Sequence, residues 1–151
     1  MKKWLLSPWL TVRFQILLGM VFVVAALPKI ADPPGFARMV YAYKLFPDWS
    51  LFLIAIFLPW LELLAGALLT LGLWVRATTA WLAVLLLGFV MALSINLARR
   101  HPVDCGCFGT HAPPKTQQER LNDMGWILLR DLGLLLVAAQ ILVASRKEKL
   151  G

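Results

Sequence analysis

The sequence contains few charged residues and almost no cysteine. Only 15% of its 151 residues are charged and 60% are hydrophobic, whereas soluble domains average about 25% charged and about 45–50% apolar residues. This composition excludes a soluble enzyme or a large extramembrane domain and is typical of membrane proteins. Acidic residues are especially scarce, with eight Asp and Glu against fifteen Lys and Arg. The basic residues are scattered at the ends of apolar runs, a pattern of lipid headgroup contacts, so we expect no nucleic acid partner.

Long apolar runs, by contrast, are frequent. At about 20 residues per membrane-spanning helix, the runs predict four spans, at about 10–28, 51–74, 79–98 and 124–144. The predicted fold is therefore an all-α, integral membrane four-helix bundle in one domain, residues 1–151, with both termini on the same side. The lipid bilayer is its first expected partner.

The first apolar run also fits the core of a signal peptide. Its uninterrupted part, Phe14 to Leu27, is short and follows Lys2 and Lys3. Pro28 stands where cleavage would be needed, which favours a retained helix.

The segments between the runs differ in character. Residues 30–49 form a loop with a short interfacial helix, and Arg76 to Thr79 form a tight connection. Gly88, Ala92 and Asn96 make a stripe of small residues, which predicts close packing on a neighbouring helix. The positive-inside rule counts equal numbers of basic residues on the two sides, so it does not orient the bundle.

Cys105 and Cys107 lie in the most unusual segment, DCGCFG. Since the chain has no third cysteine, any intrachain disulfide must join this pair. A Cys-x-Cys disulfide closes a small, strained ring, and strained disulfides are readily reduced. The alternative is two unreactive loop thiols.

A metal site is a second alternative for this loop. His101, Cys105, Cys107 and His111 supply four nitrogen and sulfur ligands for zinc or copper. Structural zinc sites usually separate their cysteines by two or more residues, so we expect no metal here.

Three ionisable residues stand inside apolar runs, which marks them as candidate functional residues. Glu62 is near the middle of the second span, and Arg130 and Asp131 lie in the fourth. Glu62 is either a proton relay or ligand contact, or a structural tie to Arg130. Arg130 and Asp131 neutralise one another or pair with Glu62 and Lys29. Because Arg130 is taken as the one basic residue at membrane depth apart from the terminal-side Arg13, we expect it to be coupled to Glu62, directly or through Asp131 or water, in a pocket beneath the cysteines.

Six tryptophans near the ends of the runs predict an aromatic belt at the membrane interfaces. Trp60 is the exception, being deep within its run. It is interpreted as core packing, or else as one wall of a ligand pocket.

Several of these segments together resemble a known family. They are Lys29-Ile30-x-Asp32-Pro33 with Phe36, Pro59-x-x-Glu62-x-x-x-Gly66, the DCGCFG segment and Arg130. They are similar to the methylamine utilisation protein MauE family, related to the DoxX-like four-helix membrane proteins. The resemblance covers roughly residues 10–145, and DCGCFG is its most specific element.

The resemblance implies a bacterial inner-membrane protein that supports disulfide formation or transfer in exported proteins. It implies a thioredoxin-like periplasmic partner and an exported, disulfide-containing client, which in the methylamine system is the small subunit of methylamine dehydrogenase. We therefore expect thiol–disulfide exchange at Cys105 and Cys107, on the periplasmic or exterior side, supported by Glu62, Arg130 and Asp131.

Two other functions stay open at this point. One is a non-enzymatic scaffold that holds a periplasmic partner at the membrane, with the cysteines as a structural clip. The other is metal handling by the His and Cys loop.

A quinone is a candidate electron acceptor by analogy with other membrane thiol oxidants, and no residue pattern specifies it.

Overall fold

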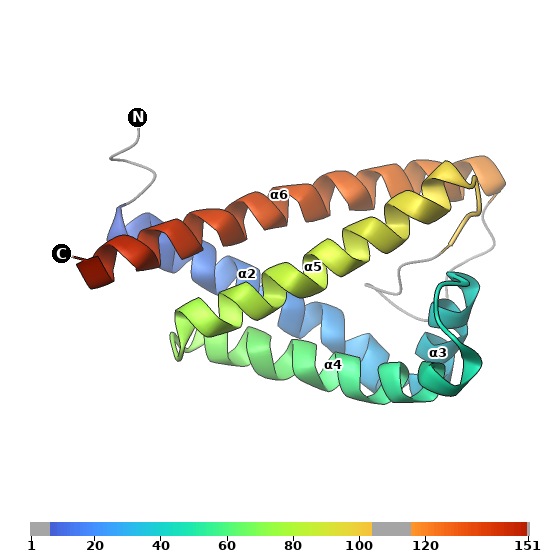
Figure 1. The fold of residues 1–151 in the computed structure, drawn as a ribbon, viewed down its shortest axis with the longest axis horizontal. Coiled ribbons are helices and arrows are strands. Elements are labelled where there is room, and N and C mark those ends of the chain that lie inside the picture. The colour runs from blue at the N-terminus through green and yellow to red at the C-terminus, as the bar shows by residue number, and fades with distance from the viewer. Residues whose placement is uncertain (1–6, 104–115, 151) are drawn as a thin grey trace.

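The computed structural model describes residues 7–103 and 116–150, with side chains as far as residue 146 (Figure 1). The DCGCFG segment, with Cys105 and Cys107, lies outside the described residues, as does His111.

All regular structure in the described ranges is helical, which confirms the predicted all-α class. The helices are α2 (Pro8–Ala31), α3 (Pro33–Ala42), α4 (Asp48–Thr70), α5 (Val75–Ala98) and α6 (Gln117–Leu150). All but α3 are long and apolar enough to cross a bilayer. Much of their surface is exposed large hydrophobic side chains, which water would disfavour and lipid solvates. The chain is a multi-pass membrane protein.

The four long helices form a bundle whose two ends differ (Figure 1). The start of α2 and the end of α6 lie at one end, together with the turn between α4 and α5. The short helix α3 lies at the opposite end. This arrangement confirms that the two termini are on the same side. We call these the terminal end and the α3 end.

The turn between α4 and α5 is placed earlier than predicted. The predicted connection, residues 76–79, is helical, and the turn occupies residues 71–74. Gly72 adopts φ +75° and Trp74 φ +49°, and a left-handed conformation stops a helix. Apolar side chains such as Leu71 and Leu73 concealed the turn in a hydropathy reading, although both are exposed on the outside of the bundle.

The short helix α3 is set directly against the end of α2 by Asp32. The Asp32 Oδ1 atom accepts a hydrogen bond from the Gly35 backbone N–H at 3.0 Å, which caps the helix. Pro33 and Pro34 occupy its first positions, where proline loses no hydrogen bond. Pro28, expected to close the first span, lies inside α2 instead, as membrane helices tolerate.

The closest helix packing is between α2 and α4. A Cβ added to Gly19 would stand 2.7 Å from the Gly66 carbonyl oxygen, and one added to Gly66 would stand 2.8 Å from the Gly19 carbonyl oxygen. The Gln15 side chain donates to the Leu69 carbonyl oxygen at 2.7 Å. The predicted close packing at Gly88 is wrong, because a Cβ there would meet nothing within 4 Å.

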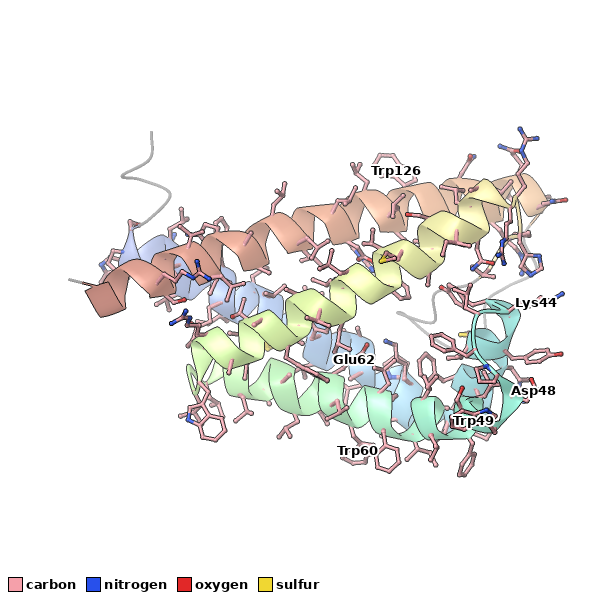
Figure 2. The ribbon with its side chains drawn as sticks, in the orientation of Figure 1. Lys44, Asp48, Trp49, Trp60, Glu62 and Trp126 are labelled. Atoms are coloured by element: carbon pink, nitrogen blue, oxygen red, sulfur yellow. The ribbon has the colours of Figure 1, made fainter. Side chains whose placement is uncertain are left out.

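The tryptophans are largely on the outside of the bundle. Trp9, Trp49, Trp74 and Trp126 are each more than 70% exposed. Trp60 is 57% exposed and points away from the bundle (Figure 2), so its interpretation as core or pocket wall is wrong. A position in the middle of a span does not say which face of the helix a residue occupies.

Candidate functional site: buried ion pairs inside the membrane bundle

Glu62 forms a buried ion pair with Lys29. The Lys29 Nζ atom donates to Glu62 Oε2 at 2.7 Å, and the two residues are 5% and 7% exposed. Lys29 stands near the end of α2, and Glu62 points from α4 into the bundle (Figure 2). A carboxylate at this depth requires a cation or a proton, and Lys29 supplies the cation.

This geometry corrects the expected direct coupling of Glu62 to Arg130. The expectation treated Lys29 as a residue at the end of the first span. Helix α2 continues past Pro28, so Lys29 remains on the helix and is buried in the bundle. Side chains on a helix tilt towards its N-terminus, which directs this long side chain into the bundle, towards Glu62.

Lys29 also contacts α3. Its Nζ atom lies 5.3 Å from the centroid of the Phe36 ring, a cation–π distance. Phe36 is buried at 5% exposure. One ammonium group thus connects α2 with α3 and α4, and this places three of the residues behind the family resemblance in one contact.

Arg130 and Asp131 form the second ion pair. The Arg130 Nε and one terminal nitrogen donate to Asp131 Oδ1 at 3.0 and 2.9 Å. Of the alternatives left open, mutual neutralisation of these neighbours is the one observed. Asp131 is 1% exposed, and its Oδ2 atom has no hydrogen-bond partner among the described residues.

The two ion pairs border one small cavity of about 50 Å³. Lys29, Glu62, Arg130 and Asp131 all line it, and its remaining walls are apolar side chains of α2, α5 and α6. A water molecule needs roughly 10–15 Å³ of such space and two or more polar partners. The cavity therefore has room for water that would hydrogen bond to Asp131 Oδ2 and link the two pairs.

Residues just before the cysteine segment are anchored at the α3 end. Val103 is 3% exposed, and its N–H points at the Met124 sulfur at 3.5 Å. The His101 Nε2 atom lies 3.2 Å from the Ala42 carbonyl oxygen, to which it can only donate. His101 therefore connects the residues that follow α5 to the end of α3.

Sequence reasoning missed Lys29 and Phe36 as members of the site. The signal for Lys29 was its place in the Lys29-Ile30-x-Asp32-Pro33 motif, together with an unpaired acid in the next span. Arg130 and Asp131, chosen as polar residues inside a span, form an ion pair and line the cavity. No hydropathy pattern, however, predicts which acidic residue forms an ion pair with which basic residue.

Fold and site together define a class: small four-span membrane bundles that keep a cluster of ionised side chains between their helices. The profile of the family described as "Methylamine utilisation protein MauE" matches residues 7–144. The chain belongs to this family.

Curated relatives give the same result. A methylamine utilization protein MauE of Methylorubrum extorquens is 32% identical over 136 residues, 89% of this chain and 69% of the relative. Those of Paracoccus denitrificans and Methylophilus methylotrophus are 37% and 36% identical over 72% and 67% of this chain. The matches cover 59% and 54% of these last two relatives. No solved structure matches the chain.

Proposed function

We propose that this protein supports thiol–disulfide exchange or disulfide formation in exported proteins, with Cys105 and Cys107 as its redox-active pair. The observation that carries the proposal is the cluster of two buried ion pairs around a cavity in a member of the MauE family. Buried charges are costly in a membrane and mark functional sites.

The chemistry assigns separate tasks to the two parts of the molecule. A thiolate of a thioredoxin-like partner attacks the Cys105–Cys107 disulfide and forms a mixed disulfide, which the partner's second thiolate resolves, so that the partner is oxidised and the pair is reduced. In each exchange the attacking thiol loses a proton and the leaving thiolate takes one up. Glu62 and Asp131, joined through the cavity, carry those protons inside the membrane, while Lys29 and Arg130 stabilise the carboxylates.

The compartment follows from the same chemistry. Persistent disulfides belong to the periplasm or cell exterior, so we place the cysteine segment on that side of a bacterial inner membrane. His101 and Val103 hold the start of this segment at the α3 end of the bundle. The terminal end would then face the cytoplasm.

The names of the relatives suggest the client. The curated relatives are called methylamine utilization proteins, and we propose that this chain likewise serves the maturation of a disulfide-rich protein of methylamine utilisation. In a methylamine-using host, deletion of the gene should then abolish growth on methylamine and leave growth on other nitrogen sources intact.

Thiol labelling tests the redox chemistry directly. The chain has two cysteines, so every alkylated thiol in the purified protein reports on this pair. We expect no labelling of the oxidised protein, labelling after mild reductant, and a mixed disulfide trapped by Cys107→Ser or Cys105→Ser. A pair that stays unlabelled under mild reductant would be a structural clip and would contradict the proposal.

A further inference from the structure

A second, larger cavity lies between α3, α4 and α5. Its volume is about 240 Å³, and its walls are mainly aromatic and aliphatic side chains, among them Phe36, Met39, Phe46, Leu58, Val84 and Phe89. Among the described residues that line it, Glu62 is the one with a charge. Since Glu62 also borders the polar cavity, this carboxylate lies between the two spaces.

The space arises from the course of the helices. α4 and α5 diverge from the turn that joins them, and α3 lies across the wide end (Figure 1). Gly88 adds to the space on α5, where a Cβ would meet nothing within 4 Å. The cavity is thus a consequence of backbone placement rather than of side-chain conformation.

The two sides of this cavity differ in exposure. Phe36, Tyr43 and Glu62 are 5–7% exposed, whereas Phe46 and Val84 are 47% and 60% exposed. The exposed residues belong to the apolar outer surface of the bundle. One side of the cavity therefore opens at the apolar outer surface of the bundle, and the Glu62 carboxylate lies on its buried side.

These features select a chemical class of ligand. Ligand pockets are mostly apolar with a few polar groups that fix orientation, and those for drug-sized molecules measure roughly 300–1,000 Å³. At about 240 Å³ this cavity accommodates a single ring with the beginning of a chain. Aromatic walls favour a flat ring, and the Glu62 carboxylate favours a ring that bears a hydroxyl group, which donates to it.

We propose that this cavity binds the ring of a lipid-soluble quinone or quinol, with the tail extending past Phe46 and Val84 into the bilayer. Glu62 accepts a hydrogen bond from a quinol hydroxyl, and donates one to a quinone carbonyl when it carries a proton. The inference deepens the proposed function and rests on it for the role of the ligand. Oxidation of the dithiol to a disulfide releases two electrons and two protons, and these convert one quinone to one quinol. Glu62 contacts the ring and is its source of protons.

The test is direct binding of decylubiquinone to the full-length protein in lipid nanodiscs, measured by equilibrium dialysis. Gly88→Phe fills the cavity and should weaken binding by at least about tenfold, a factor worth about 1.4 kcal/mol. Gly133→Phe is the matched control, because a Cβ at Gly133 on α6 also meets nothing within 4 Å and Gly133 does not line the cavity. Unchanged binding in folded Gly88→Phe, or equal loss in both variants, would overturn the assignment.

Val84→Trp tests the same cavity from its exposed side, should Gly88→Phe not accumulate. Decylbenzene, which has the ring and chain without the ring oxygens, separates a quinone site from a site for any apolar chain. We expect decylubiquinone to bind more tightly, and the double variant Lys29→Met/Glu62→Leu, which removes the carboxyl group without leaving Lys29 unpaired, to reduce that preference. Equal affinity for both probes in wild type would identify an acyl-chain site and refute the proposal.

Binding should persist when Cys105 and Cys107 are both replaced by serine. Absence of thiol exchange in the wild type, with quinone binding intact, would contradict the proposed function alone. Loss of binding with intact thiol exchange would contradict the quinone site alone.

Discussion

At the scale of single residues, the Lys29–Glu62 pair is the most costly feature of the molecule to disturb. Both groups are removed from water and lie 2.7 Å apart. Each charge is tolerated because the other is present. Removing one partner leaves an isolated buried charge, whereas removing both leaves none.

A double-mutant cycle on this pair should therefore be strongly non-additive. We expect Glu62→Gln and Lys29→Met each to lower the free energy of unfolding by about 3–5 kcal/mol, and the double variant to recover much of this loss. Thermal unfolding in detergent measures the effect. Arg13→Gln, an exposed charge on the same helix, is the control and should change stability by less than about 0.5 kcal/mol.

The double variant also separates structure from function. If the pair carries protons, the double variant should fold and yet exchange disulfides slowly. Normal turnover per folded molecule would show that Glu62 is a structural tie, and our proton path would be lost.

His101 provides a second test at this scale. Its observed partner is the Ala42 carbonyl oxygen, so we expect His101→Ala to loosen the α3 end without loss of a metal. Purified protein should hold well under one equivalent of zinc or copper by elemental analysis. Stoichiometric metal that disappears in His101→Ala would revive the metal interpretation.

At the scale of elements, the pairing of α2 with α4 is fixed by glycine rather than by large apolar side chains. Lipid solvates leucine as well as a neighbouring helix does, so helices in membranes associate through close backbone approach. Gly19 and Gly66 permit this approach, and the same pairing sets Lys29 opposite Glu62. The ion pair therefore depends on packing about one turn away on α4 and nearly three turns away on α2.

We expect Gly19→Ala to destabilise the protein by about 1–3 kcal/mol, as overpacking does. The added methyl group would meet the Gly66 carbonyl oxygen at 2.7 Å and the Thr70 hydroxyl, which is nearer still. Gly88→Ala is the matched control, since it meets no atom within 4 Å, and it should be neutral or stabilising. Thermal unfolding of the two variants, measured in parallel, checks this ranking. Equal stability would mean that α2 and α4 approach each other less closely at Gly19 than the distances above indicate.

At the scale of the whole molecule, the question is which end faces the periplasm. The basic residues predicted for the two sides are equal in number and give no answer. The proposed redox chemistry of the cysteine pair would place it on the exterior, because disulfides persist there and are rare in the cytosol.

A membrane-impermeant maleimide applied to intact spheroplasts under mild reductant should label Cys105 or Cys107. The matched control is Leu71→Cys in a background with both native cysteines replaced by serine. Leu71 lies in the turn at the terminal end and is 72% exposed, so this thiol should react only after lysis. The reverse pattern would place the cysteines in the cytoplasm and exclude the proposed function.

The sequence by itself determined the fold class, the number of spans and the position of the polar residues at membrane depth. Hydrophobic length is a local property, because each span must cross about 30 Å of hydrocarbon by its own residues. The cap at Asp32 and the prolines that begin α3 are also local. The turn at residues 71–74 was misplaced because its side chains are apolar and lack the polar residues that mark most turns.

Only the tertiary structure decided which residues meet. Glu62 had two cations within plausible reach, and the register of α2 on α4 selected Lys29 over Arg130. Gly88, whose small size predicted a packed interface, instead lines the cavity between α3, α4 and α5, where a Cβ would meet nothing within 4 Å. Pairing and cavities depend on the relative placement of helices distant in sequence, and in a bilayer that placement is set by close contacts such as Gly19 with Gly66, which hydropathy does not encode.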